Sequence, residues 1–187
     1  MKVLGIMCSP RKAGNTEILV REALAGARES GAEVELLRIS DMNITACDGC
    51  ETCHQSGECR IKDDMQKVYK KLLAADGIIL GSPVYFWSVS SQAKMFMDRT
   101  YALRYPCHKL KNKVGGAIAA AGSRGSVNAL SIINNFFLGQ DMLATGLGIS
   151  GYGTKKGEVK RDKRAMQGAR SLGNQVVQLI KLIKSQE

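Results

Sequence analysis

Short apolar runs alternate with amphipathic helical patterns along the whole of this 187-residue chain. Strands joined by helices of this length pair in parallel, through right-handed crossovers. The pattern therefore predicts an α/β fold built on a doubly wound, five-stranded parallel sheet. The predicted strands are residues 2–8, 33–39, 77–81, 113–121 and, more weakly, 142–149. The apolar spacing predicts helices at residues 16–29, 64–74, 90–103, 127–138 and 161–184.

The strand order 2-1-3-4-5, which is flavodoxin-like, fits this alternation. A chain of this length supports one buried core and is too short for two ordinary domains, so we expect a single domain at residues 1–187. Ligands of such sheets bind beyond the carboxyl ends of the strands, between the first and third. Residues 40–63 form a long irregular insertion after the second strand, and insertions of this kind are usually functional.

Four of the six cysteines lie in that insertion, in a C-x2-C-x2-C-x5-C run. Closely spaced thiolates followed by a more distant fourth match the way 4Fe-4S clusters are held. Structural zinc is the alternative, although it usually takes two C-x-x-C pairs with a longer spacer. A disulfide pair is less favoured, because cytosolic thiols stay reduced. The candidate metal ligands are Cys47, Cys50, Cys53 and Cys59.

The loop at residues 8–17, between the first strand and the first helix, has the parts of an anion site. It combines hydroxyl groups, a guanidinium, a glycine and the start of a helix, whose free N–H groups attract anions. It is neither a Walker loop nor a G-x-G-x-x-G fingerprint, so a single monophosphate is the predicted ligand. The alternative is an ordinary turn and helix N-cap. The candidate ligands are Ser9, Arg11, Lys12, Asn15 and Thr16.

Three consecutive aromatic residues, at positions 85–87, follow the third strand on the same edge of the sheet. Burying such a group against a flat partner is favourable, and a flavin ring is such a partner. Backbone N–H groups near Ser88 and Val89 are expected to bond the pyrimidine edge of the ring, and the loop at residues 121–125 to border it. Core capping or a subunit contact is the alternative. The candidates are Pro83, Val84, Tyr85, Phe86, Ser88 and Gly122.

The formal net charge of +10 predicts a basic surface. Aromatic residues make up 5% of the chain and do not interleave with a basic stripe, so we expect no nucleic-acid partner. An acidic redox protein such as a ferredoxin suits the charge equally well. No apolar run reaches the ~20 residues of a membrane span, and the first residues are too short for a secretory signal. We therefore expect a cytoplasmic protein without a membrane partner.

Three segments together resemble one known family. The motifs C-S-P-R-K-x-G-N-T and G-S-P-V-Y-F, with the compact cysteine run between them, are similar to those of the iron-sulfur flavoproteins. That family is a branch of the NADPH-dependent FMN reductase superfamily. The resemblance implies FMN and a 4Fe-4S cluster on a flavodoxin-like fold, in a homodimer or homotetramer where one subunit's cluster approaches another's flavin. It also implies that the four cysteines ligate the cluster and that residues 83–86 contact the flavin.

By this resemblance the chain is an electron-transfer oxidoreductase. Ferredoxin is the expected donor, with a small molecule as acceptor. Two alternatives remain: an NAD(P)H-dependent FMN or quinone reductase with zinc or no metal at the cysteines, and a non-enzymatic redox sensor. No convincing acid–base pair is present, so no catalytic side chain is assigned. We expect the cysteine segment and the flavin site to share one edge of the sheet, with electron transfer within or between subunits.

Overall fold

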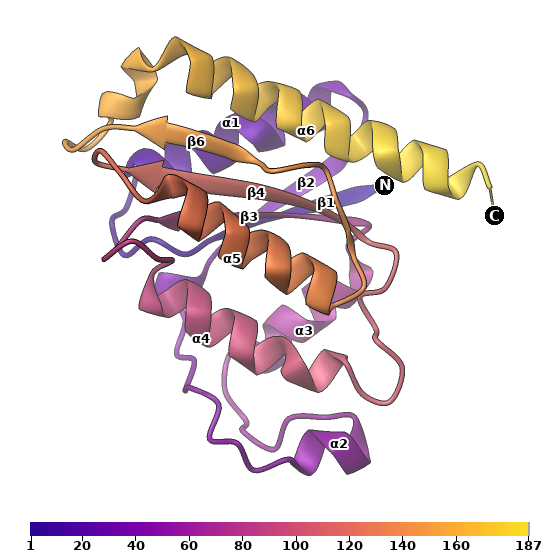
Figure 1. Ribbon diagram of the computed structural model, residues 1–187. Coiled ribbons are helices and arrows are strands. Elements are labelled where there is room, and N and C mark those ends of the chain that lie inside the picture. The colour runs from indigo at the N-terminus through magenta and orange to yellow at the C-terminus, as the bar shows by residue number, and fades with distance from the viewer. Residues whose placement is uncertain (187) are drawn as a thin grey trace.

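A parallel sheet in the order β2-β1-β3-β4-β5 lies between two layers of helices in the computed structural model, which describes residues 1–186 (Figure 1). Residue 187, the last of the predicted domain, lies outside the described residues. Helices α1 (Asn15–Glu29) and α6 (Lys163–Lys184) cover one face, and α3 (Met65–Ala74), α4 (Ser91–Arg99) and α5 (Ser126–Gly139) the other. The main strands are β1 (Lys2–Met7), β2 (Glu33–Arg38), β3 (Gly77–Pro83) and β4 (Val114–Ala121), and β5 (Leu143–Ala144) is a short edge strand. The predicted order is confirmed.

Strands β3 and β4 are buried along their whole length, as expected where helices cover both faces of a parallel sheet. Small residues let the helices approach closely. A Cβ on Gly115 of β4 would lie 2.6 Å from the ring of Phe137 in α5, so this glycine leaves the space that the ring fills. Two apolar clusters result, one on each face of the sheet.

The prediction of one continuous fifth strand at residues 142–149 is wrong. The structure has two short strands there, β5 (Leu143–Ala144) and β6 (Ile149–Tyr152), both parallel to β4. Two glycines between them, Gly146 and Gly148, have φ values of 103° and 98°, a backbone region that favours glycine. They let residues 145–148 leave the sheet and return to it. The edge therefore ends at Tyr152, three residues beyond the predicted end.

Several helix boundaries also differ from the predictions. The pattern at residues 90–103 is α4 followed by a 3₁₀ turn, η2 (Thr100–Leu103). The pattern at 161–184 becomes η3 (Glu158–Arg161) and then α6, whose N-cap is Asp162, because its side chain accepts the N–H of Ala165. The insertion at 40–63 is confirmed after β2. The 3₁₀ turn η1 (Ile39–Asp41) overlaps its start, and the insertion contains an unpredicted short helix, α2 (Thr52–Ser56).

No helix among residues 1–186 is long and apolar enough to cross a bilayer.

Candidate functional site

The loop between β1 and α1 is held in a defined shape by its own side chains. Ser9 is buried, and its hydroxyl accepts the Arg11 N–H at 3.2 Å. The Gly14 N–H donates to the Arg11 carbonyl at 3.3 Å, which closes the turn. Helix α1 begins at Asn15, so the first N–H groups of the helix face this loop without partners inside the helix. The loop thus combines a helix N-terminus with an exposed guanidinium, as an anion site requires.

A buried carboxylate, that of Glu17, stabilises this loop by accepting a hydrogen bond from its backbone. Glu17 accepts the Ala13 N–H at 2.8 Å and forms ion pairs with Arg21 and Arg38. Burial opposes its ionisation, but the Ala13 N–H and the two arginines outweigh burial and hold the pKa of Glu17 below its ordinary value. Glu17 therefore remains charged and already paired. It secures the loop without presenting its negative charge to a bound anion.

A cavity of about 260 Å³ opens where this loop meets the ends of β3, β4 and β6. Eight of the eleven residues predicted to bind the cofactor line it. They are Ser9, Arg11, Asn15, Thr16, Pro83, Val84, Tyr85 and Gly122. Lys12, Phe86 and Ser88 do not line it; Lys12 is exposed and lies 4.0 Å from Asp41.

Sequence reasoning missed the fourth wall of this cavity, the loop that follows β6. Gly153, Thr154 and Lys156 line the cavity from there. The amide of Asn15 holds this loop, because its nitrogen donates to the Gly153 carbonyl at 2.8 Å and to the Lys155 carbonyl at 3.0 Å. Small residues and a lysine just beyond the last strand could have indicated a fourth ligand-binding loop. Because the fifth strand was predicted to end at residue 149, these residues were not placed at the edge of the sheet.

The aromatic segment forms a tight turn at the edge of the cavity. Tyr85 and Ser88 exchange both backbone hydrogen bonds, at 2.9 and 3.0 Å, and the φ values of Phe86 and Trp87 are 50° and 65°. Two positive values define a type I′ turn, which glycine and asparagine usually occupy. The Ser88 N–H therefore donates to the Tyr85 carbonyl within the turn, and the expectation that N–H groups near Ser88 and Val89 bond a flavin stays a prediction. Each strained aromatic residue costs about 1 kcal/mol.

The turn leaves its aromatic side chains in solvent. Phe86 is 100% exposed and Trp87 57%. The base of the turn is fixed, because the Ser90 hydroxyl donates to the Cys8 carbonyl at 2.6 Å and the Ser90 N–H donates to the Ser82 hydroxyl at 2.9 Å. A strained, rigidly based and exposed aromatic tip is typical of a surface that meets a partner or a ligand.

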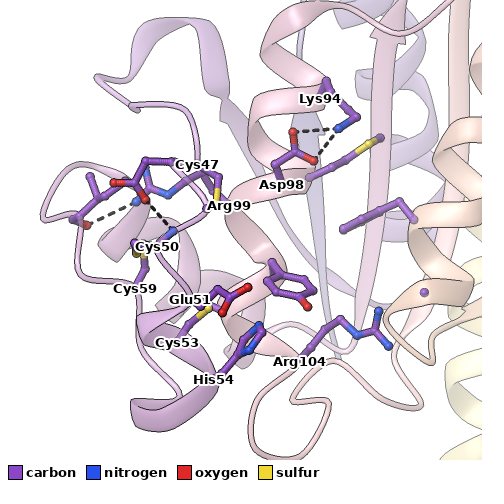
Figure 2. Close-up of a pocket in the computed structure, with 18 of the residues that line it drawn as sticks. Cys47, Cys50, Glu51, Cys53, His54, Cys59, Lys94, Asp98, Arg99 and Arg104 are labelled. Carbon is purple, nitrogen blue, oxygen red and sulfur yellow. Dashed lines mark hydrogen bonds and ion pairs between the residues drawn. The ribbon is translucent and has the colours of Figure 1, made fainter.

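The four clustered cysteines line one larger cavity, of about 680 Å³ (Figure 2). The insertion at residues 40–63, called the cysteine segment, forms one side of it, and the other side comes from α4, η2 and α5. Apolar side chains make much of that second wall, namely Met97, Ala102, Ile132 and Phe136. Cationic side chains also line the cavity, namely Arg60, Lys94, Arg99 and Arg104. Among the described residues no three metal-binding side chains converge on one point as a single ion would need.

The cysteines influence one another's charge. Burial raises the pKa of Cys53, and negative charge on Cys59, Cys47 and Cys50 raises it further, so the four sulfurs lie within electrostatic reach of one another. The pKa of Cys50 is lowered, mainly by the Thr52 hydroxyl at 3.5 Å from its sulfur and by the Thr52 N–H. Arg60 adds a smaller effect in the same direction. Cys8, by contrast, is fully buried, and burial raises the pKa of its thiol.

The larger cavity, lined by the four cysteines, is called the cysteine cavity, and the smaller one, beside the loop before α1, the phosphate-loop cavity. The two cavities have no lining residue in common. The cysteine segment leaves the sheet at its carboxyl edge, as predicted. Its cysteines, however, lie against the C-terminal part of α4 and the outer side of α5, and α2 is far from the sheet in Figure 1. The expectation that both sites share one edge is therefore wrong. The cause is the length of the segment, which carries the cysteines past the edge.

Comparison with known proteins identifies the family. The model of the NADPH-dependent FMN reductase family matches residues 1–151. An iron-sulfur flavoprotein of Methanocaldococcus jannaschii is 46% identical over 98% of this chain and 100% of its own length. This chain belongs to the iron-sulfur flavoproteins of the NADPH-dependent FMN reductase family. The iron-sulfur flavoproteins were the family predicted from the motifs, and that prediction is confirmed.

Solved structures confirm the flavodoxin-like fold of this iron-sulfur flavoprotein. RosB, solved with bound 8-demethyl-8-formylriboflavin-5′-phosphate, superposes with a TM-score of 0.82 at 18% identity, over 99% of this chain and 81% of RosB. A WrbA-like flavodoxin from Agrobacterium tumefaciens has a TM-score of 0.69 at 18% identity, over 97% of both chains. Family membership makes this protein a flavin-dependent oxidoreductase that uses FMN.

Proposed function

We propose that this iron-sulfur flavoprotein passes electrons between FMN, bound at the loop before α1, and a 4Fe-4S cluster, ligated by the four clustered cysteines. The observation that carries the proposal is the gathering of all four cysteines on one cavity, separate from the phosphate-loop cavity. FMN exchanges electrons singly or in pairs and a cubane exchanges them singly, so the two groups suit conversion between one-electron and two-electron carriers.

The spacing of the four cysteines favours a cluster over a single zinc ion. Structural zinc usually takes two C-x-x-C pairs with a longer spacer, whereas three of these cysteines follow one another at intervals of three residues. All four cysteines line one cavity. Four cationic side chains and three carboxylates, those of Asp48, Glu51 and Asp98, line the same space, so the lining would offset only part of the negative charge of thiolates and cluster. Thr52 and Arg60 favour the thiolate of Cys50, the form that binds metal.

The smaller cavity suits the phosphate end of FMN. At about 260 Å³ it lies below the usual range of whole-ligand pockets, so it would hold the phosphate and part of the ribityl chain. The ring would then lie outward over Tyr85 and the exposed aromatic tip. Ser9, Thr16 and the first N–H groups of α1 would bond the phosphate, and Arg11 would neutralise it. Asn15 would position the loop after β6 against the same group.

Two separate cavities in one chain favour electron transfer between subunits. The cysteines lie on the outer side of α4 and α5, and the aromatic tip projects Phe86 fully into solvent. A homodimer or homotetramer that places one cysteine cavity against the aromatic tip of a second copy would join the two sites. Such an assembly would also cover the strained tip.

A basic surface near the flavin cavity supports an acidic redox protein as the donor. Exposed cations follow β6 in the loop, in η3 and in the first turn of α6, namely Lys155, Lys156, Lys160, Arg161, Lys163 and Arg164. Lys156 also lines the flavin cavity. We propose ferredoxin as the donor and a small molecule as the final acceptor.

Anaerobic reduction of the flavin, measured side by side with reduced ferredoxin and with NADPH, tests this choice of donor. We expect ferredoxin to reduce the flavin faster at low salt, and added salt to slow that reduction. Reduction by NADPH alone would contradict it.

Replacing Arg11 by alanine tests the phosphate site. We expect the FMN dissociation constant to rise about tenfold, because a charge-assisted bond to phosphate is lost from an exposed position. Lys12→Ala is the matched control, since it removes a neighbouring cation that does not line the cavity. Fluorescence titration of the apoprotein with FMN measures both. Equal effects of the two substitutions would contradict the assignment and indicate only general attraction to the basic loop.

A further inference from the structure

Arg99, the last residue of α4, is a fully buried cation at the base of the cysteine segment. Its side chain is 0% exposed, and a charge so buried is costly unless it is paired and hydrogen-bonded. One guanidinium nitrogen, Nη1, donates to the Thr45 carbonyl and to Asp63, both at 2.6 Å. The other, Nη2, donates to Asp63 at 3.1 Å and to the Ile61 carbonyl at 3.3 Å. A single side chain therefore bonds three residues of the insertion.

These partners lie on the two ends of the cysteine segment. Thr45 precedes Cys47 by two residues, and Ile61 follows Cys59 by two. Asp63 completes the junction, because its carboxylate also accepts the Thr45 N–H at 2.8 Å and the Met65 N–H at 3.0 Å. All four cysteines fall between the two bonded ends. The Arg99–Asp63 pair thus joins the entry and the exit of the segment to each other and to α4.

Arg99 also belongs to the cysteine cavity. It lines that cavity together with all four cysteines, as Figure 2 shows. Its Nε atom is buried and has no hydrogen-bond partner among the described residues, which is unusual for a guanidinium nitrogen. Burial lowers the pKa of Arg99, but Asp63, Tyr69 and Cys59 outweigh burial and hold it above its ordinary value. The charge of Arg99 is therefore present at any working pH and is felt at Cys59.

We propose that Arg99 is a positioning residue of the cysteine cavity. Its forked guanidinium holds the two ends of the cysteine segment together, which keeps Cys47 and Cys59 on one cavity. Arg99 and Asp63 form a pair of opposite charges, so the proposed effect comes through the position of the cysteines and not through net charge. That the cavity holds a cluster rests on the proposed function, whereas the joining of the two ends does not.

The decisive variant replaces the buried pair by apolar side chains, Arg99→Met with Asp63→Leu. Exchanges of this kind are often neutral for folding, so we expect normal FMN binding and normal amide protection in β1 and β3. In purified FMN-loaded protein, amides of residues 46–62 should exchange about tenfold faster than in the wild type. The cluster should lose iron to a chelator at about tenfold lower chelator concentration, because its ligands are no longer held in place.

Two single variants separate the fork from the charge. Arg99→Lys keeps the charge but lacks the fork, so exchange of residues 46–62 should still rise. Arg104→Met removes another cation of the same cavity and should leave exchange in residues 46–62 unchanged. Wild-type exchange in Arg99→Lys overturns the joining of the two ends, even if the double variant does not fold. Wild-type resistance to the chelator in an iron-loaded double variant overturns the positioning of the ligands. Absence of iron from the wild type would contradict the proposed function and leave the exchange test valid.

Discussion

Cys50→Ser should yield a folded protein that binds FMN and carries no iron-sulfur cluster. Each cysteine supplies one iron ligand, and serine replaces a thiolate by a hydroxyl that stays protonated at neutral pH. Cys50 is the cysteine whose pKa is lowered by its surroundings, through Thr52 first and then Arg60. Loss of this ligand should remove nearly all of the cluster absorbance. Visible spectra and iron analysis of anaerobically prepared protein measure the loss.

FMN binding should survive this substitution, because the two cavities share no lining residue. Cys107→Ser is the matched control: Cys107 is also exposed but lies outside the four-cysteine run, so its replacement should leave both cofactors in place. Loss of FMN together with the cluster in Cys50→Ser would show that the sites depend on each other. Retention of iron and sulfide at wild-type levels would remove Cys50 from the ligand set.

Gly173→Ala should be the most destabilising of the small substitutions in α6. This helix crosses α1 so closely that a Cβ on Gly173 would lie 1.8 Å from the carbonyl oxygen of Ala23. That atom belongs to the helix backbone and cannot rotate away, so the two helices must separate along their contact. We expect a loss of roughly 2–3 kcal/mol of unfolding free energy, the usual cost of overpacking. The melting temperature should fall by about 4–12 °C.

Gly168→Ala, five residues earlier in the same helix, is the control for this prediction. A Cβ there would lie 3.1 Å from the end of the Ile149 side chain, which can move. Alanine favours the helix over glycine by up to about 1 kcal/mol, so this variant should match or exceed the wild-type stability. Thermal unfolding with FMN bound compares the two. Equal stability of the two variants would contradict the close backbone contact at Gly173.

The sheet was predictable because its signals are local and repeated. β3 reads as an apolar run between polar segments, and its burial along both faces follows from the helices that must cover it. The split of the last strand was not predictable in the same way. It depends on two glycines at positive φ, Gly146 and Gly148, which interrupt a short, half-exposed edge strand. Apolar periodicity carries no information about such an interruption.

The candidate sites were predictable as residue sets but not in their arrangement. The anion loop and the cysteine run both carry motifs that name their chemistry. The path of residues 40–63 depends on Arg99, which is 59 positions away from the start of that segment and bonds it at both ends. A buried cation at the end of a helix gives no sequence signal of its partners. That contact fixes the two ends of the segment at α4, and the length of the segment carries the cysteines past the edge of the sheet.

The most direct test of the whole account is the cofactor content of wild-type protein prepared without oxygen. Iron, acid-labile sulfide, zinc and FMN would be measured per chain on one sample. The account predicts about four iron and four sulfide with one FMN, and no stoichiometric zinc. One zinc per chain with no sulfide would contradict it, and would leave a flavin reductase whose cysteines hold a structural ion.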